Sequence, residues 1–241
     1  AVLRGEEMLN LFLKTILSFQ VDFFAKMFPG FVHPFSCILS GPSQCGKTVF
    51  LSKILKAPHL YIHEPLCRVV WCYGVKNKSQ MARLRSASHL PIEFVEGIPD
   101  LEDISVDGER VILVLDDLMS SAGRSREVAD LFTKGCHHRN LSTFLTMQNF
   151  FHQGPSMRDL HTSSSYDFVW KSPRDCSQMK VLERQMFPDK KDYLVNAYNL
   201  ATKNPYHYLG IDFTQETPDE KRLFTNIFPG EGVFSYFNYV K

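Results

Sequence analysis

Short apolar segments alternate along most of this chain with longer segments that have a helical period. The apolar segments have the composition of buried β-strands; they are Ser36–Leu39, Arg68–Tyr73, Ile92–Val95, Val111–Leu115, Leu141–Met147 and Tyr166–Trp170. The periodic segments predict helices at Lys47–Lys56, Asn77–Ser88, Ser125–His137, Pro173–Phe187 and Asp189–Ala201. Strands that alternate with helices in this way predict an α/β fold with a mainly parallel central sheet.

The two ends of the chain differ from this central pattern. Glu6–Phe28 carries apolar residues close to a helical period and ends at Pro29-Gly30, which predicts an amphipathic helix packed on the main body. From Tyr206 onward the aromatic-rich segments YHYLGIDF, RLFTNIF and GVFSYFNYV predict an antiparallel extension at one edge of the sheet. We therefore expect residues 1–30 to form an N-terminal helix on a single domain that covers residues 31–241.

Charge is balanced over the 241 residues, with 27 Lys and Arg against 26 Asp and Glu, so no overall excess indicates a nucleic-acid partner. Its distribution is uneven, because the stretches between Glu64 and Glu93 and between Asp130 and Asp159 contain Lys and Arg but no acid. The stretch Glu93–Glu109 is instead strongly acidic. The basic stretches could follow a phosphate backbone. A basic face and an acidic face on one subunit would suit head-to-tail contacts in a ring. Ordinary solvated faces nevertheless explain any individual charge.

The six cysteines show no C-x-x-C pair and no zinc-ligand spacing, which favours reduced thiols in an intracellular protein. His137 and His138 are adjacent and do not converge on a metal, so no zinc site is expected there. The chain has no run of eighteen apolar residues, and it has no basic region followed by an apolar stretch and a cleavage site. We therefore expect neither a membrane span nor a secretory signal.

The first apolar segment leads into Gly41–Thr48, which matches the phosphate-loop pattern G-x-x-x-x-G-K-[ST] at every fixed position. The glycines permit a tight turn whose backbone N–H groups can bind anionic oxygens. Lys47 would place a positive charge on the β- and γ-phosphates, and Thr48 would offer its hydroxyl to Mg²⁺. The simpler alternative is an accidental glycine turn. On the first reading the nucleotide is bound by Gly41, Pro42, Ser43, Gln44, Cys45, Gly46, Lys47, Thr48 and Val49.

The strand Val111–Leu115 runs directly into two acids, Asp116 and Asp117. Opposite a phosphate loop, Asp116 would hold Mg²⁺ directly or through water, and Asp117 would orient and polarise the attacking water. The alternative is a helix cap or turn after a core strand, because Asp is common at such positions. Two candidate strands separate Lys47 from Asp116 in the sequence, so an additional strand can lie between the loop strand and the acid strand.

Gln148 ends the next apolar strand, and ligands of open parallel sheets bind at the carboxyl ends of strands. Gln148 would therefore point toward the γ-phosphate or the attacking water, unless it is simply a solvated side chain. Phosphoryl transfer often uses an arginine from a neighbouring subunit. The candidates are Arg139, Arg158 and Arg174, and Arg174 could instead pair with Asp175 or begin a helix.

Four segments in this order, GPSQCGKT, VILVLDD, TKGCHHRNLSTFLTMQN and VWKSPRD, resemble the DNA-packaging ATPases of the FtsK/HerA superfamily. The resemblance is to the poxvirus-like kind also found in Polinton/Maverick elements and adintoviruses. It implies an additional-strand P-loop NTPase with a RecA-like three-layer sandwich. By position, Lys47 and Thr48 resemble the phosphate and Mg²⁺ residues, Asp116 and Asp117 the second acidic motif, and Gln148 the polar sensor. Arg139 or Arg174 would be the arginine that acts in trans.

The resemblance implies an ATP- and Mg²⁺-dependent motor, a homo-oligomeric ring that drives double-stranded DNA into a capsid. A capsid or portal protein would be a further partner of this motor. The motor would work in the host nucleus or cytoplasm and not at a membrane. Two segments depart from the family's pattern, Gln44-Cys45 in the loop and Asp159–Tyr166. A helicase or other nucleic-acid motor of the same fold remains an alternative, as does a nucleotide-binding scaffold without turnover.

Overall fold

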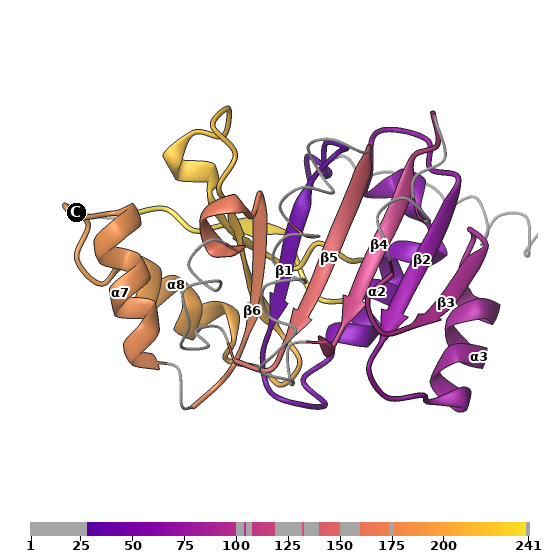
Figure 1. Cartoon of the computed structure of the whole chain (residues 1–241). Helices are drawn as coiled ribbons and strands as arrows, with labels where there is room; N and C mark the ends of the chain where they lie inside the picture. The colour runs from indigo at the N-terminus through magenta and orange to yellow at the C-terminus, as the bar shows by residue number, and fades with distance from the viewer. Residues whose placement is uncertain are drawn as a thin grey trace, which may run out of the picture.

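The structure is a computed structural model that describes residues 28–99, 108–118, 140–149, 160–173 and 176–239, together with residues 104 and 132 (Figure 1). The predicted helices Glu6–Phe28 and Ser125–His137 lie outside the described residues except for Phe28 and Phe132. In the part of the chain that is described, every helix is too short or too polar to span a lipid bilayer. Among the described residues Cys45, Cys67 and Cys72 have reduced thiols.

The described residues form one sheet of nine strands in the order β3-β2-β4-β5-β1-β6-β7-β8-β9. The six strands from β3 to β6 run parallel, and β7, β8 and β9 are antiparallel to their neighbours. The predicted α/β fold with a mainly parallel sheet and an antiparallel extension is therefore confirmed. The strands are β1 (Ser36–Ser40), β2 (Arg68–Tyr73), β3 (Ile92–Glu96), β4 (Val111–Asp116), β5 (Leu141–Met147), β6 (Tyr166–Trp170), β7 (Tyr208–Asp212), β8 (Leu223–Thr225) and β9 (Ser235–Tyr236).

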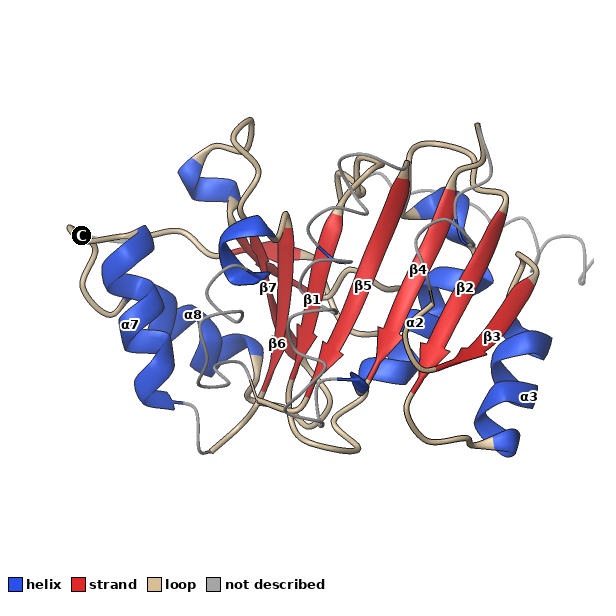
Figure 2. Ribbon diagram, viewed as in Figure 1, coloured by secondary structure: helices blue, strands red, loops and turns tan. Residues whose placement is uncertain are grey.

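One additional strand separates the loop strand β1 from the acid strand β4, as the sequence allowed. This strand is β5, which follows β4 in the chain and ends just before Gln148. The two strands that separate Lys47 from Asp116 in the sequence, β2 and β3, lie on the far side of β4. Figure 2 shows β1, β5, β4 and β2 side by side, with their arrowheads at the same edge of the sheet.

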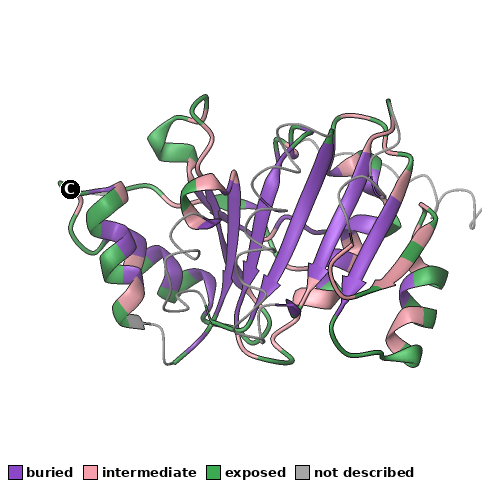
Figure 3. Ribbon diagram, viewed as in Figure 1, coloured by how far each residue is buried: buried purple, intermediate pink, exposed green. Residues whose placement is uncertain are grey.

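The central strands β1 and β5 are buried along their whole length (Figure 3). On one face α2 (Lys47–Lys56) and α3 (Lys78–Ala87) pack on an aromatic core that includes Phe144 and Phe168. On the other face the core includes the helical residues Ile104, Phe132 and Leu160. Short 3₁₀ helices follow α2 at Pro58–Leu60 and precede β8 at Asp219–Lys221.

The predicted C-terminal helical pair is present as α7 (Cys176–Met186) and α8 (Tyr193–Ala201), which pack against β7 and β8. Helix α8 begins later than the predicted Asp189, since the chain turns through Asp192 with a positive φ of 57°. The carboxylate of Glu183 on α7 accepts hydrogen bonds from the N–H groups of Asp192 and Val195, at 2.9 and 3.1 Å. A neighbouring helix therefore supplies the cap that the sequence of α8 itself lacks.

Candidate active site

The carboxyl ends of three adjacent strands meet at one edge of the sheet. Ser40, the last residue of β1, pairs with Met147 of β5, and Asp116 of β4 pairs with Thr146 of β5. The N–H of Gly41 continues the ladder by donating to the carbonyl of Met147 at 3.1 Å. The phosphate loop, Gln148 and Asp117 therefore leave the sheet side by side, as strand polarity predicts for residues that follow parallel strands.

The loop from Gly41 to Gly46 is held in a shape that its first glycine makes possible. A Cβ atom at Gly41 would lie 2.7 Å from the Cβ of Trp170 and 2.9 Å from the Sγ of Cys45, so only glycine fits. Gly46 has a φ of 113° and directly precedes α2, whose first intrahelical bond runs from the N–H of Phe50 to the carbonyl of Gly46. The N–H groups of the first helical turn therefore have no intrahelical acceptor and are available to an anion.

Lys47 folds back over the loop that precedes it. Its ammonium donates to the carbonyls of Gly41 and Pro42, the latter at 3.0 Å, and lies 3.8 Å from the Sγ of Cys45. Burial raises the pKa of the Cys45 thiol, and the Lys47 charge opposes this less strongly, so the thiol stays protonated at neutral pH. Cys45 is thus a packing residue beneath Gly41, which accounts for its place in the loop.

Asp116 is partly buried and anchored on both carboxylate oxygens. Its Oδ1 accepts from the Thr146 hydroxyl at 2.8 Å, and its Oδ2 accepts from Trp71 Nε1 at 3.3 Å and from Gln80 Nε2 at 3.4 Å. Burial raises the pKa of Asp116 above its ordinary value, whereas the bonds from Thr146 and Trp71 lower it. The negative charge of Asp117 raises this pKa further, and the positive charge of Lys47 lowers it.

Asp117 and Gln148 lie together at the exposed side of the site. Gln148 Nε2 donates to both carboxylate oxygens of Asp117, at 3.3 and 3.2 Å. Asp117 has a positive φ of 53°, and its N–H donates to the hydroxyl of Thr146 at 3.0 Å. One hydroxyl therefore orients the carboxylate of Asp116 and holds the backbone of Asp117.

Thr146, Trp71 and Gln80 were not among the residues that the sequence pointed to. The sequence indicated Thr146 only weakly, as a polar residue one position before the end of an apolar strand. It gave no indication of Trp71 or Gln80, because the strand order of the folded sheet is what brings β2 and α3 close to Asp116.

The residues predicted to hold Mg²⁺ fit a magnesium ion. Thr48 lines a cavity of about 220 Å³ together with Ser52, Gln80 and Arg83, and Gln80 also donates to Asp116. One hydroxyl and one carboxylate then lie on the same side of the loop, and Mg²⁺ takes its other ligands from water and phosphate oxygens. Among the described residues no group of three or more His, Cys, Asp or Glu side chains could hold a metal ion.

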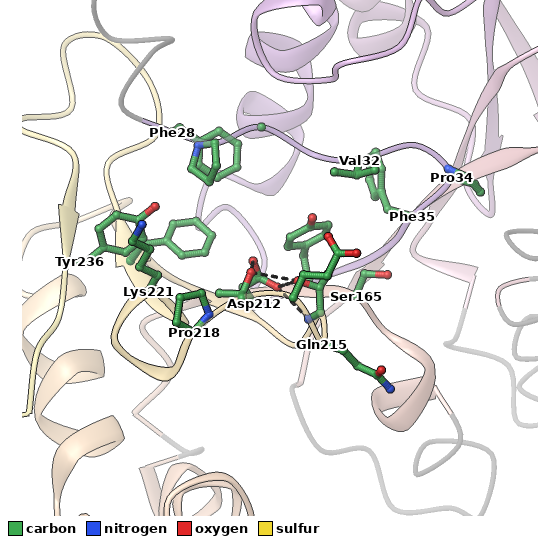
Figure 4. A pocket seen from close by; sticks show the side chains of 17 residues that line it. Phe28, Val32, Pro34, Phe35, Ser165, Asp212, Gln215, Pro218, Lys221 and Tyr236 are labelled. Atoms are coloured by element: carbon green, nitrogen blue, oxygen red, sulfur yellow. Dashed lines mark hydrogen bonds between the residues drawn. The ribbon is translucent and has the colours of Figure 1, made fainter.

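A larger cavity of about 470 Å³ lies at the opposite end of β1 and contains none of the predicted site residues (Figure 4). Its floor is apolar, with Phe35 at the start of β1 and Tyr166 at the start of β6. Asp212 on its polar side accepts from the hydroxyls of Thr214 and Thr217, at 2.6 and 2.8 Å. Strand direction, and not cavity size, therefore identifies the candidate active site.

One residue of the predicted basic stretch is not available to a nucleic acid. Arg68 forms ion pairs with Glu93 at 3.1 Å and with Glu109 at 3.0 Å, because β2 lies between β3, which carries Glu93, and β4, which begins just after Glu109. The other basic residues of that stretch are exposed on α3 or just before it: Lys76, Lys78, Arg83 and Arg85. The candidate trans-acting residues lie outside the described residues, namely Arg139, Arg158 and Arg174.

A phosphate loop between β1 and α2, with β5 inserted before an acid strand, defines the fold as that of an additional-strand P-loop NTPase. No protein-family model and no curated protein matches the chain by sequence.

Solved structures with similar arrangements are known, all at low identity. The genome-packaging NTPase of Sulfolobus turreted icosahedral virus 2, in complex with ATP-gammaS, is 13% identical with a TM-score of 0.43, over 76% of this chain and 94% of that one. A protein of Pyrococcus horikoshii is 12% identical with a TM-score of 0.43, over 61% and 86% of the two chains. EscN, the type III secretion ATPase of enteropathogenic E. coli, is 12% identical with a TM-score of 0.38, over 64% and 45%. Scores this low carry no argument about activity.

Proposed function

We propose that this protein is a Mg²⁺-dependent ATPase that works as a motor on double-stranded DNA. One observation supports ATP hydrolysis above all others. The phosphate loop, the Asp116-Asp117 pair and Gln148 meet at the carboxyl ends of β1, β4 and β5. A loop that binds phosphate beside an exposed carboxylate and an amide is the arrangement that hydrolysis of a phosphoric anhydride requires.

Each residue then has a physical role in hydrolysis. Lys47 and the free N–H groups at the start of α2 bind the β- and γ-phosphates. Thr48 and Asp116 would hold Mg²⁺, which would supply positive charge against the negative charge of the phosphates. Asp117 accepts a proton from the attacking water, and Gln148, whose amide nitrogen already donates to Asp117, keeps its carbonyl oxygen for the same water.

The DNA and packaging part of the proposal is supported by the resemblance of four segments to viral packaging ATPases and by exposed basic residues on α3. The protein forms a ring in which Arg139 or Arg174 completes the site of the next subunit. Its DNA is delivered to a capsid, through a capsid or portal protein.

The test is ATP hydrolysis measured against protein concentration, with and without double-stranded DNA. We expect turnover that rises steeply with protein concentration and is stimulated by DNA, because a site completed in trans exists only in the oligomer. Lys47→Ala removes this turnover, and Lys180→Ala, which changes an exposed lysine on α7, leaves it intact. A specific activity that is independent of protein concentration contradicts the ring, and an absence of Lys47-dependent turnover contradicts the ATPase.

Two other functions make different predictions in the same system. A helicase of this fold separates strands in a displacement assay and does not fill capsids. A scaffold binds nucleotide by way of Lys47 without hydrolysing it, even when DNA is present.

A further inference from the structure

Helix α2 presents two different flanks beside the phosphate loop. Thr48 and Ser52 are one helical turn apart and line the cavity that also contains Gln80, which donates to Asp116. Val49 and Lys53, also one turn apart, line a second cavity of about 320 Å³. The first cavity is therefore on the side of the metal residues, and Val49, which lines both cavities, lies at the border between them.

Half of the residues that line the second cavity come from the C-terminal part of the chain. Trp170 ends β6, Tyr206 lies between α8 and β7, and Glu231 lies between β8 and β9. The loop borders this cavity directly, because a Cβ atom at Gly46 would lie 3.9 Å from the Cβ of Tyr206. The antiparallel extension thus completes a cavity that begins at the phosphate loop.

Tyr206 is unusual in both its backbone and its exposure. Its φ is 67°, a left-handed conformation that bulky residues rarely adopt, and its side chain is 72% exposed. The backbone is held in place because Trp170 Nε1 donates to the Tyr206 carbonyl at 3.0 Å. An aromatic side chain is therefore exposed beside the loop, on a strained backbone whose carbonyl is held by Trp170.

We propose that Tyr206 is a platform on which the purine base of the nucleotide stacks, with Val49 on the other side of the base. This proposal rests on the proposed function and adds the subsite for the base. A nucleotide whose phosphates lie in the loop then extends past Gly46 and Val49 into the cavity that both residues line together with Tyr206. Every base has a flat face, and stacking on an aromatic side chain strengthens binding substantially.

Polar groups close the far end of this cavity. Lys53 donates to Glu231 at 2.6 Å, and the Tyr208 hydroxyl donates to the same carboxylate at 2.7 Å. Glu231 is mostly buried, so this network is fixed before a ligand arrives. A base that stacks on Tyr206 therefore meets a rigid polar edge, as the polar rim of a purine requires.

The test compares ATP with inorganic tripolyphosphate, which has the phosphates but no base, by calorimetry in the presence of Mg²⁺. Tyr206→Asn removes the ring and tolerates the positive φ, whereas Tyr206→Phe keeps the ring. We expect Tyr206→Asn to weaken ATP binding about tenfold or more and to leave tripolyphosphate binding unchanged. We expect Tyr206→Phe to bind both ligands as the unmodified protein does. Tyr239→Ala, which removes another exposed tyrosine, is the matched control.

Other outcomes separate this inference from the proposed function. If Tyr206→Asn leaves ATP binding unchanged, or weakens both ligands equally, the base does not stack on Tyr206. If the unmodified protein binds tripolyphosphate as tightly as ATP, and Lys47→Ala abolishes both, the phosphate loop is functional and the base subsite is wrong. If Lys47→Ala affects neither ligand, the nucleotide site itself is wrong, and the inference fails with it.

Discussion

The two parts of the sheet differ in how they contribute to the candidate site. From β3 to β6 the strands are parallel, so residues far apart in the sequence, such as Gly41, Asp117 and Gln148, reach the same edge. From β7 to β9 the strand direction alternates, and the strands share no common carboxyl edge. The parallel part therefore collects chemical groups at strand ends, whereas the antiparallel part contributes through its loops.

Packing in the two parts also differs. The parallel strands β1, β4 and β5 are buried and mostly aliphatic, whereas aromatic rings join the antiparallel strands β7 and β8 to β6 and α2. Changes at the parallel strand ends should alter catalysis and leave the fold intact. Changes in the antiparallel part should alter stability first.

The largest expected effect is on turnover at the parallel strand ends. Gln148→Ala and Asp117→Asn should each lower kcat by roughly 10² to 10³, since each removes a group that positions or deprotonates the attacking water. The KM for ATP should change only a few-fold, because Lys47 and the loop amides are intact. Steady-state kinetics provides the measurement, with Gln215→Ala at the other end of the sheet as the control. An unchanged kcat with a raised KM would assign these residues to binding instead.

The second effect is on stability in the antiparallel part. A Cβ atom at Gly210 of β7 would lie 2.4 Å from the Phe224 ring of β8, so Gly210→Ala should lower the free energy of unfolding by about 1–3 kcal/mol. Urea denaturation measures this change. The double variant Gly210→Ala/Phe224→Leu, which provides space for the new methyl group, should recover part of the loss. Without such recovery, the contact with Phe224 is not the cause.

A smaller effect, and an increase in stability this time, is expected when the charge of Asp116 is removed. Burial raises the folded-state pKa of this carboxyl, so the folded protein binds its proton more tightly than the unfolded chain. Stability from this group therefore falls as the pH rises from the unfolded value of 3.8 through the raised pKa, and the loss persists at pH 7.

Asp116→Asn removes the charge and can still accept from Trp71 while donating to the hydroxyl of Thr146. The variant should melt at a higher temperature than the unmodified protein at pH 7, and the difference should shrink as the pH falls toward 4. Turnover should be lost at every pH, since the metal ligand is gone. Thermal melts across this pH range provide the measurement, and a variant that is less stable at pH 7 would contradict the assigned cause.

The smallest effect is expected where α2 meets the antiparallel part. The Lys53–Glu231 ion pair is 2.6 Å long, but the side chain of Lys53 is 40% exposed and therefore screened by solvent. Lys53→Met keeps the aliphatic stem near the Phe228 ring and should cost less than about 1 kcal/mol. The difference from the unmodified protein should decrease in high salt, and a difference that is independent of salt would show that packing dominates.

Most of the secondary structure could be predicted, because buried parallel strands appear in the sequence as short apolar runs. The ends of these strands are marked by a change from apolar to polar residues. The bounds of β2, β5, β6 and α2 agree with the predicted ranges. The start of α8 was placed too early, since its cap comes from Glu183 on another helix. Arg68 lies in a stretch of the sequence that contains no acid, and its pairing with Glu93 and Glu109 depends on which strands are neighbours.

The sequence by itself determined that a phosphate loop, two acids and a glutamine follow apolar strands, because those features are local and periodic. Tertiary structure alone decided which strands are neighbours, since strand order depends on contacts between residues far apart in the chain. It placed β5 between the loop and the acids, so that Thr146 contacts the carboxylate of Asp116 and the backbone of Asp117, and Gln148 contacts the Asp117 carboxylate. It also brought Tyr206 to the flank of the loop, where no local pattern could have located it.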